Sequence, residues 1–252
     1  MRFAAISVAE LWKLKDDPQI YIVDLRSRAD FQVFHLRNAH CYPYDEIEHW
    51  EHKLPKNRKI LLCCEYGNTS MYAAKRLTRQ GYQIYTLIGG LQDMMIETCG
   101  RFRWEMCRKI QGMRWNDITE KSLTSEYCDY IQYYRKNRDL STEAKEKIKN
   151  TLWKSKNNYR EVFISDYIGW IKYEAGGSFR LNRVARDILF RYCPFAKKYR
   201  DALEANPMYQ DMISRFKIFQ ERKLRHIDGF RTRYEKNGGE MNMELQENMN
   251  FY

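Results

Sequence analysis

The stretch CCEYGNTS, residues 63–70, follows the apolar run KILL, residues 59–62, and decides how the first part of the chain folds. The apolar run predicts a buried strand that ends at the two cysteines. Residues 69–80 have the apolar spacing of a helix, and Gly81 is placed to end it. A strand, a glycine-containing loop and a helix in this order are typical of a parallel sheet.

The same alternation continues on both sides of this loop. Residues 20–23 and 82–87 predict two further strands, Ser7 is placed to cap a short helix, and another helix is expected from Leu91. Residues 1–99 are therefore expected to form an α/β domain, with a central parallel sheet and helices on both faces.

The loop offers the sulfur of Cys64 a set of inward-turned backbone N–H groups. The expected donors of this anion cradle are the residues Glu65, Tyr66, Gly67, Asn68, Thr69 and Ser70. These donors and the helix N-terminus favour a negative charge, and a thiolate is both an anion and a nucleophile. Gly67 and Asn68 permit the left-handed backbone of a tight loop, and the hydroxyls of Thr69 and Ser70 can cap the helix or donate to the sulfur. Cys63 should face the opposite side of the strand; the alternative is that both cysteines are buried apolar residues.

The segment CEYGNTS resembles the active-site loop of the single-domain rhodaneses, which are sulfurtransferases. Residues 22–26, IVDLR, are similar to that family's strand followed by Asp-x-Arg. Residues 34–39, FHLRNA, resemble its Gly-His-Ile-Pro-Gly-Ala segment, and the Gly81-Tyr82 and Gly89-Gly90 pairs have its spacing. The resemblance covers residues 4–98 and implies a rhodanese-like α/β fold.

The resemblance also implies an activity. Cys64 would take sulfane sulfur from a small molecule or a protein persulfide, carry it as a persulfide, and pass it to a thiol or another nucleophilic acceptor. No metal and no organic cofactor are implied. Asp24 and Arg26 would brace the loop by ion pairing, and His35 would be structural. The alternative is a catalytically weak rhodanese-like sensor or scaffold whose second half binds nucleic acid or a protein partner.

Two departures from related sequences bear on the substrate. Phosphatases and arsenate reductases of similar fold close their loop with an arginine, but Thr69 or Ser70 occupies that position here, so phosphate-ester chemistry lacks its charge clamp. Many rhodaneses carry a basic residue directly after the cysteine or at the end of the loop, where this chain has Glu65 and Thr69. We therefore expect poor attraction for thiosulfate, a dianion, and a neutral or protein-borne persulfide as the donor.

The second half of the chain has a different composition. Residues 1–100 hold 13 Lys and Arg against 12 Asp and Glu, whereas residues 101–252 hold 31 against 21. Glycine and proline become rare and helical spacing dominates, which predicts a basic all-helical domain over residues 100–236. Residues 237–252 are polar and predict a disordered tail. No family resemblance is evident after residue 100.

The basic half contains an outline of a helix-turn-helix. Residues 159–174 and 179–192 predict two helices that flank Gly176-Gly177. The second helix carries Arg180, Asn182, Arg183 and Arg186 away from its apolar stripe. These side chains could contact nucleic acid, or they could form an ordinary solvated face.

Cysteine usage and the apolar pattern bear on location. The seven cysteines form no CxxC pair and none has zinc-ligand spacing with histidine, so we expect no metal site and a reduced, cytoplasmic protein. The first residues lack a secretory signal pattern, and no apolar run approaches the length of a membrane span, so no membrane partner is expected.

Overall fold

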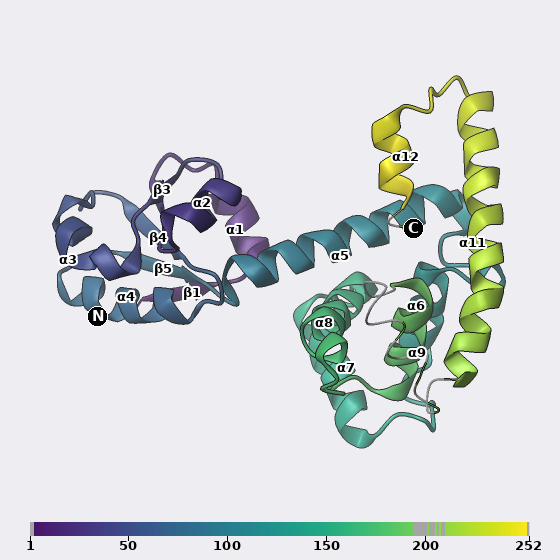
Figure 1. The fold of residues 1–252 in the computed structure, drawn as a ribbon. Helices are drawn as coiled ribbons and strands as arrows, with labels where there is room; N and C mark the ends of the chain where they lie inside the picture. The colour runs from purple at the N-terminus through teal and green to yellow at the C-terminus, as the bar shows by residue number, and fades with distance from the viewer. Residues whose placement is uncertain (1–2, 194–200, 202–204, 206, 208–209, 251) are drawn as a thin grey trace. The chain divides into compact units, whose positions relative to one another are not determined.

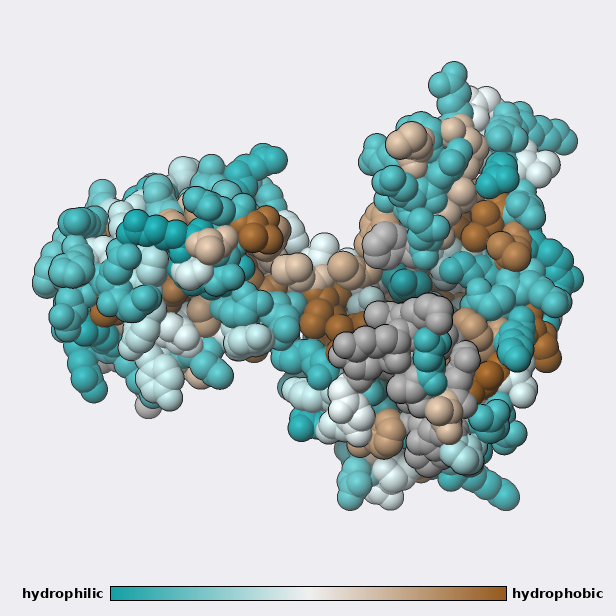
Figure 2. All heavy atoms as spheres, viewed as in Figure 1, coloured by the Kyte–Doolittle hydropathy of each residue, from teal (hydrophilic) through white to brown (hydrophobic). Residues whose placement is uncertain are grey.

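The computed structural model describes residues 3–193, 201, 205, 207, 210–250 and 252. It divides into two compact units, residues 1–97 and residues 98–252 (Figure 1). Figure 2 shows that hydrophilic residues cover most of the visible surface of both units, with apolar residues exposed in small groups.

The N-terminal unit is built on a five-stranded sheet in which every pair of neighbouring strands is parallel. Its strands are β1 (Ala4–Ile6), β2 (Ile20–Asp24), β3 (Ala39–Cys41), β4 (Lys59–Cys63) and β5 (Ile84–Leu87), in the spatial order β1-β5-β4-β2-β3. Its helices are α1 (Val8–Leu14), α2 (Arg28–Val33), α3 (Ile47–Trp50), α4 (Asn68–Arg79) and the start of α5 (Gly90–Gln111). The predicted parallel α/β class is confirmed.

Helices cover both faces of this sheet because successive residues of its strands point to opposite sides. One cluster of buried residues joins Ile60 and Leu62 of β4 to Ala73, Ala74 and Leu77 of α4. A second cluster joins Leu61 and Cys63 of the same strand to Leu11 of α1 and Leu91 and Met94 of α5. Strand β4 is therefore buried on both sides, which explains its unbroken apolar run.

Residues 98–252 are largely helical, as the sequence predicts. Besides the remainder of α5, the helices are α6 (Leu123–Gln132), α7 (Thr142–Lys154), α8 (Tyr159–Lys172), α9 (Arg183–Tyr192), α11 (Gln210–Lys236) and α12 (Met243–Met249). The side chains that cap α6, α7, α8, α9 and α12 are Ser122, Ser141, Asn158, Asn182 and Asn242. Each accepts a backbone N–H of the first turn, which is a preferred start for a helix.

Aromatic side chains fill the core of the helical unit. The ring of Phe163 on α8 lies 5.3 Å from Trp104 and 5.2 Å from Tyr127 between centroids. All three residues are buried. The spacing and tilt of the rings are those of favourable aromatic pairs, so these residues serve packing rather than base stacking.

Two features differ from the predictions by more than two residues. Helix α9 begins at Arg183 rather than Phe179, because Asn182 has an extended backbone and caps the helix. The tail predicted to be disordered contains α12, whose Leu245 and Met249 are buried; residue 251 lies outside the described residues. The sequence-based prediction missed the capping signal of Asn242.

Candidate active site

Strand β4 places Cys64 at the carboxyl edge of the sheet, beside the N-terminus of α4. The strand ends at Cys63, whose carbonyl oxygen accepts a hydrogen bond from the N–H of Leu25 at 2.9 Å. The next residue, Cys64, packs with Leu62 beneath α4 and is 4% exposed. Because the carboxyl ends of parallel strands are the usual ligand-binding edge of an α/β sheet, this is the expected place for a reactive group.

Two backbone N–H groups donate to the sulfur of Cys64. The nitrogen of Gly67 lies 3.2 Å from Sγ, and that of Ser70 lies 3.3 Å from it. Both belong to the N-terminal end of α4, where the partial positive charge of the helix is concentrated. Donors at hydrogen-bond distance stabilise a negative charge on the sulfur because that charge strengthens each bond.

The hydroxyl of Ser70 has a different partner from the two expected ones. It donates to the carbonyl oxygen of Gly67 at 3.0 Å, and neither caps the helix nor reaches the sulfur. Gly67 is the N-cap residue, and because it has no side chain, no side-chain hydrogen bond caps the start of α4. The Ser70 hydroxyl therefore holds the loop closed while its backbone N–H faces the sulfur.

Gly67 and Gly90 allow the loop to lie directly against α5. Both have positive φ angles, +85° and +66°, which suit glycine. A Cβ on Gly90 would lie 2.4 Å from the carbonyl oxygens of Cys64 and Glu65. These same oxygens accept hydrogen bonds of 2.9 and 3.0 Å from the N–H groups of Leu91 and Gln92. The approach of two backbones therefore fixes the position of Cys64.

Arg26 joins the end of β2 to the cysteine loop. Its guanidinium donates to Asp24 at 2.8 Å and to Glu65 at 3.3 Å, and it also binds the carbonyl oxygen of Phe34. Burial by itself would lower the pKa of Arg26. Hydrogen bonds to Asp24 and Glu65 and the negative charges of these two residues raise it by more, so the pKa of Arg26 lies above its ordinary value. The carboxylate of Glu65 is thus directed toward a cation at the rim of the loop.

The adjacent cysteine lies in a contrasting environment. Cys63 is 1% exposed and packs on the face of the sheet that α1 and α5 cover. Burial, reinforced by the charge of Asp24, raises the pKa of Cys63 well above its ordinary value. A thiol that resists ionisation is a poor nucleophile, so the two neighbouring cysteines are chemically distinct.

Histidine 35 lies in a local structural arrangement. His35 Nδ1 is 2.8 Å from the carbonyl oxygen of Phe31, and its ring stacks on that of Phe31 with centroids 4.0 Å apart. The ring is exposed, and His35 follows the C-terminal end of α2 by two residues. These contacts suit the structural role expected for His35.

The cysteines of the helical unit are mostly buried. Burial raises the pKa of Cys107, and that of Cys128 and Cys193 to about 11, whereas Cys99 is exposed. Among the described residues, no three His, Cys, Asp or Glu side chains are placed to hold a metal ion. No helix formed by these residues is both long and apolar enough to cross a membrane.

Two of the four residues predicted to contact nucleic acid are engaged within the helical unit. Asn182 Oδ1 accepts the N–H of Ala185 at 3.0 Å as the cap of α9. Arg186 Nε donates to Glu174 at 2.8 Å, and the side chain of Glu174 is only 1% exposed. Loss of Arg186 would therefore leave a buried carboxylate without its cation, which is a structural role.

The other two residues have different surroundings. The guanidinium of Arg180 lies over the ring of Tyr173, 3.8 Å from its centroid. Arg183 is exposed on the first turn of α9. The four side chains therefore do not share the free, groove-reading face that the helix-turn-helix outline predicts.

Family comparisons match both parts of the chain. A family model described as a rhodanese-like domain matches residues 7–97, and one described as a domain of unknown function (DUF8509) matches residues 112–252. The chain is 30% identical over 93 residues to the thiosulfate sulfurtransferase GlpE of Coxiella burnetii, covering 36% of this chain and 87% of that protein. It is 34% identical over 73 residues to the adenylyltransferase and sulfurtransferase uba4 of Ogataea parapolymorpha, covering 28% and 19%.

Solved structures give similar matches. A rhodanese homologue of Thermus thermophilus is 35% identical, covers 35% of this chain and 97% of its own, and has a TM-score of 0.30. A rhodanese-related protein of Thermoplasma volcanium is 22% identical, covers 37% and 91%, and has a TM-score of 0.35. The chain is thus a member of the rhodanese-like family through residues 7–97, and it belongs to the DUF8509 family through residues 112–252.

Proposed function

We propose that the rhodanese-like domain is a sulfurtransferase that carries sulfane sulfur as a persulfide on Cys64. The observation that carries this proposal is the pair of backbone N–H donors, from Gly67 and Ser70, at 3.2 and 3.3 Å from one sulfur atom. The sulfurtransferases among the curated relatives support the same reaction class. Phosphate-ester chemistry remains disfavoured because the loop ends in Thr69 and Ser70 without an arginine.

The proposed reaction has two steps, each a displacement at sulfur. The Cys64 thiolate attacks the outer sulfur of the donor, a new S–S bond forms, and the bond that held this sulfur to the donor breaks; it is an S–S bond in thiosulfate and in a persulfide, and a C–S bond in mercaptopyruvate, where the electron pair leaves with the pyruvate enolate. With thiosulfate, the electron pair of that bond leaves with sulfite, and Cys64 holds a persulfide. A thiolate of the acceptor then attacks the outer persulfide sulfur and releases Cys64 as a thiolate. No net oxidant or reductant is consumed.

The loop serves both steps. Its N–H donors stabilise the thiolate that begins the cycle and the persulfide anion that follows it. Cys64 is 4% exposed, so the sulfur to be transferred has to be small or carried at the end of an extended group. A small inorganic donor, or a persulfide on a protruding side chain of a partner, meets this requirement.

The proposal predicts which cysteine gains sulfur. The full chain is incubated with thiosulfate, mercaptopyruvate or a protein persulfide, alkylated, and mapped by peptide mass spectrometry. The Cys64 peptide should gain the mass of one sulfur atom, and Cys64→Ser should lose this gain, whereas Cys63→Ala should keep it. Absence of the gain with every donor, or its persistence in Cys64→Ser, would contradict the proposal.

The carboxylate of Glu65 should weaken the use of an anionic donor. We expect Glu65→Gln to raise kcat/KM for thiosulfate about two- to fivefold, because it removes a repulsion of about 1 kcal/mol or less beside the loop. The pairing of Glu65 with Arg26 at 3.3 Å keeps the effect small. The gain should shrink in high salt and be absent with a neutral persulfide donor.

A matched control separates this local effect from a change in net charge. Asp16 is exposed and precedes β2, so it lies toward the amino edge of the parallel sheet, opposite the cysteine loop. Asp16→Asn should leave kcat/KM for thiosulfate unchanged. Equal gains in the two variants, or no gain in Glu65→Gln at low salt, would show that Glu65 does not govern donor choice.

A further inference from the structure

The helical unit has a small hollow between α11 and the end of α5 (Figure 1). The two helices contact each other here: Arg233 of α11 donates to the carbonyl oxygen of Ile110 at 2.7 Å, and Gln111 Nε2 lies 3.0 Å from Nδ1 of His226. The hollow has a volume of about 130 Å³. Drug-sized ligands usually occupy sites of about 300 to 1,000 Å³, so this hollow suits a single small group.

The lining of this hollow is polar and mainly cationic. It includes three arginines, Arg114, Arg225 and Arg233, and one carboxylate, that of Glu120. All three arginines are exposed, so their side chains are open to solvent and to a ligand that arrives from it. Guanidinium groups present several N–H donors in a fixed fork that matches the oxygens of an anion, so the lining predicts an anionic ligand.

The carboxylate does not cancel this positive charge. Arg114 lies 2.6 Å from Glu120, so these two charges largely offset each other. Within the described part of the chain, no ion pair and no side-chain hydrogen bond involves Arg225. Arg233 donates to a carbonyl oxygen, which is a neutral acceptor and leaves its charge in place. The charges of Arg225 and Arg233 therefore remain available to a ligand.

The pKa of a histidine beside the hollow reflects the same excess of positive charge. Burial lowers the pKa of His226, and the carboxylate of Glu120 acts against this. The charges of Arg222, Arg225 and Arg233 lower it further, so His226 is neutral at pH 7. The cations that oppose a proton on His226 favour a negative charge in the adjoining hollow.

A glycine inside α11 borders the hollow. Gly229 lies four residues after Arg225 and four before Arg233, so the three positions follow one side of the helix. Glycine destabilises a helix interior relative to alanine, yet the packing does not require it here. The backbone of Gly229 is helical, and a Cβ would meet one described atom within 4 Å, Nη1 of Arg233 at an ordinary 3.5 Å. The result of this glycine is open space beside Arg233.

We propose that this hollow binds a phosphate group, held by the guanidinium groups of Arg225 and Arg233 in the space that Gly229 leaves open. A phosphate has enough oxygens to accept hydrogen bonds from two guanidinium groups at once, and it is small enough for a site of about 130 Å³. The site lies within residues 98–252 and does not depend on the chemistry at Cys64.

The test measures binding to the full chain by calorimetry at low ionic strength, with inorganic phosphate, adenosine 5′-monophosphate and adenosine as probes. The better of the two phosphate-bearing probes should bind at least about tenfold more tightly than adenosine. Inorganic phosphate that binds as tightly as the monophosphate identifies the free anion as the ligand, whereas tighter binding of the monophosphate identifies a phosphate ester. The proposal is overturned if neither binds, or if adenosine binds as tightly as the monophosphate.

A variant that keeps every charge separates the hollow from general attraction to a basic surface. Gly229→Leu fills the hollow, and leucine favours a helix more than glycine does, so α11 should remain folded. The affinity for the better probe should fall about tenfold in Gly229→Leu and in Arg225→Gln. Arg138→Gln, at an exposed arginine of the same unit outside the hollow, should change the affinity less than about twofold. Equal losses in Arg225→Gln and Arg138→Gln, or an unchanged affinity in Gly229→Leu, would overturn the proposal.

Discussion

Alanine at position 90 is expected to destabilise the rhodanese-like domain by about 3 to 5 kcal/mol. The new Cβ would lie 2.4 Å from the carbonyl oxygens of Cys64 and Glu65, which are backbone atoms and cannot rotate away. Relief requires the loop to move off α5, which breaks the hydrogen bonds that Leu91 and Gln92 donate to these oxygens. The left-handed φ of +66° adds its own strain for any residue with a side chain.

Gly81 provides a matched control for this variant. Its φ of +88° is also left-handed, but a Cβ there meets no described atom within 4 Å. Gly81→Ala should therefore lower the free energy of unfolding by only about 1 to 2 kcal/mol, which is the strain of a left-handed backbone for a residue with a side chain. The difference between the two variants isolates the cost of moving the loop.

Hydrogen exchange of the full chain in increasing denaturant resolves the effect. Peptides from β4 and α4 should lose protection at lower denaturant in Gly90→Ala than in Gly81→Ala, and peptides from α8 should change in neither. Sulfur loading of Cys64 should fall in Gly90→Ala even where the domain remains folded. Equal protection in the two variants would mean that the loop and α5 do not meet closely.

The sequence predicts the centre of the sheet better than its edges. Strands β2, β4 and β5 are buried runs, and the turn signals around them are local, so residue patterns identify them. Strands β1 and β3 have three residues each and are the outermost strands. Such segments gain their strand conformation from pairing with a neighbour, which a pattern within the segment does not reveal.

The candidate site is predicted only as far as its contacts are local. Gly67 and Ser70 follow Cys64 by three and six residues, so strand-loop-helix geometry places their N–H groups at the sulfur. The Arg26–Glu65 pair joins residues 39 positions apart, and only the pairing of β2 with β4 brings them together. This pairing directs the Glu65 charge to a cation, which the sequence alone could not show.

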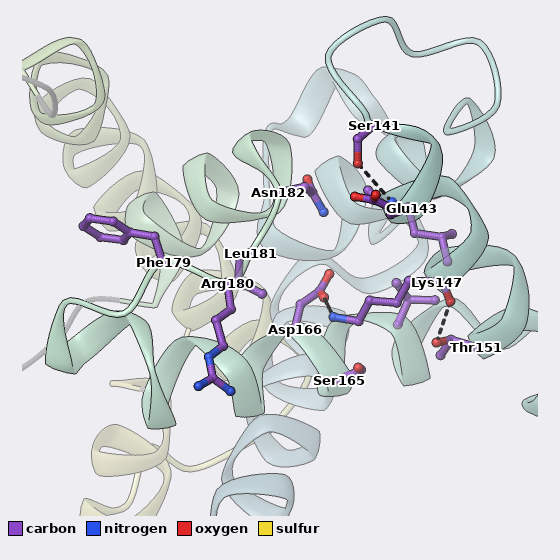
Figure 3. A pocket seen from close by; sticks show the side chains of 13 residues that line it. Ser141, Glu143, Lys147, Thr151, Ser165, Asp166, Phe179, Arg180, Leu181 and Asn182 are labelled. Atoms are coloured by element: carbon purple, nitrogen blue, oxygen red, sulfur yellow. Dashed lines mark hydrogen bonds and ion pairs between the residues drawn. The ribbon is translucent and has the colours of Figure 1, made fainter.

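The buried position of Asp166, beside the cavity between α7 and α8 (Figure 3), was not predicted for the same reason. In the sequence, Asp166 is one polar residue within an apolar helical stretch, which ordinarily indicates a solvated position. Burial follows from the packing of α7 against α8 and from the segment before α9. Its cation, Lys147, is 19 residues earlier, so no local spacing links the two.

Replacing Asp166 by asparagine is expected to stabilise the helical unit by about 3 kcal/mol at pH 7.5. Burial raises the pKa of Asp166 from an ordinary 3.8 to about 6, and Lys147 offsets only part of this effect. Between these two pKa values the unfolded chain loses the proton and the folded chain keeps it. Stability therefore falls as the pH rises toward 6, and above 6 the full cost of the buried charge is present.

The asparagine variant carries no charge at this position, so the difference in free energy of unfolding between the variant and the wild-type protein should depend on pH. This difference should decline from about 3 kcal/mol at pH 7.5 to about 1 kcal/mol at pH 4.5, because at pH 4.5 most of the folded wild-type protein is protonated at Asp166. Denaturation of the full chain, with hydrogen exchange of α8 peptides to report on this unit, measures both values.

Asp139→Asn is the control, since Asp139 is exposed and should give little change at either pH. If Asp166→Asn stabilises equally at both pH values, the gain comes from packing rather than from the buried charge. If it destabilises at pH 7.5, the ion pair with Lys147 outweighs the cost of burial.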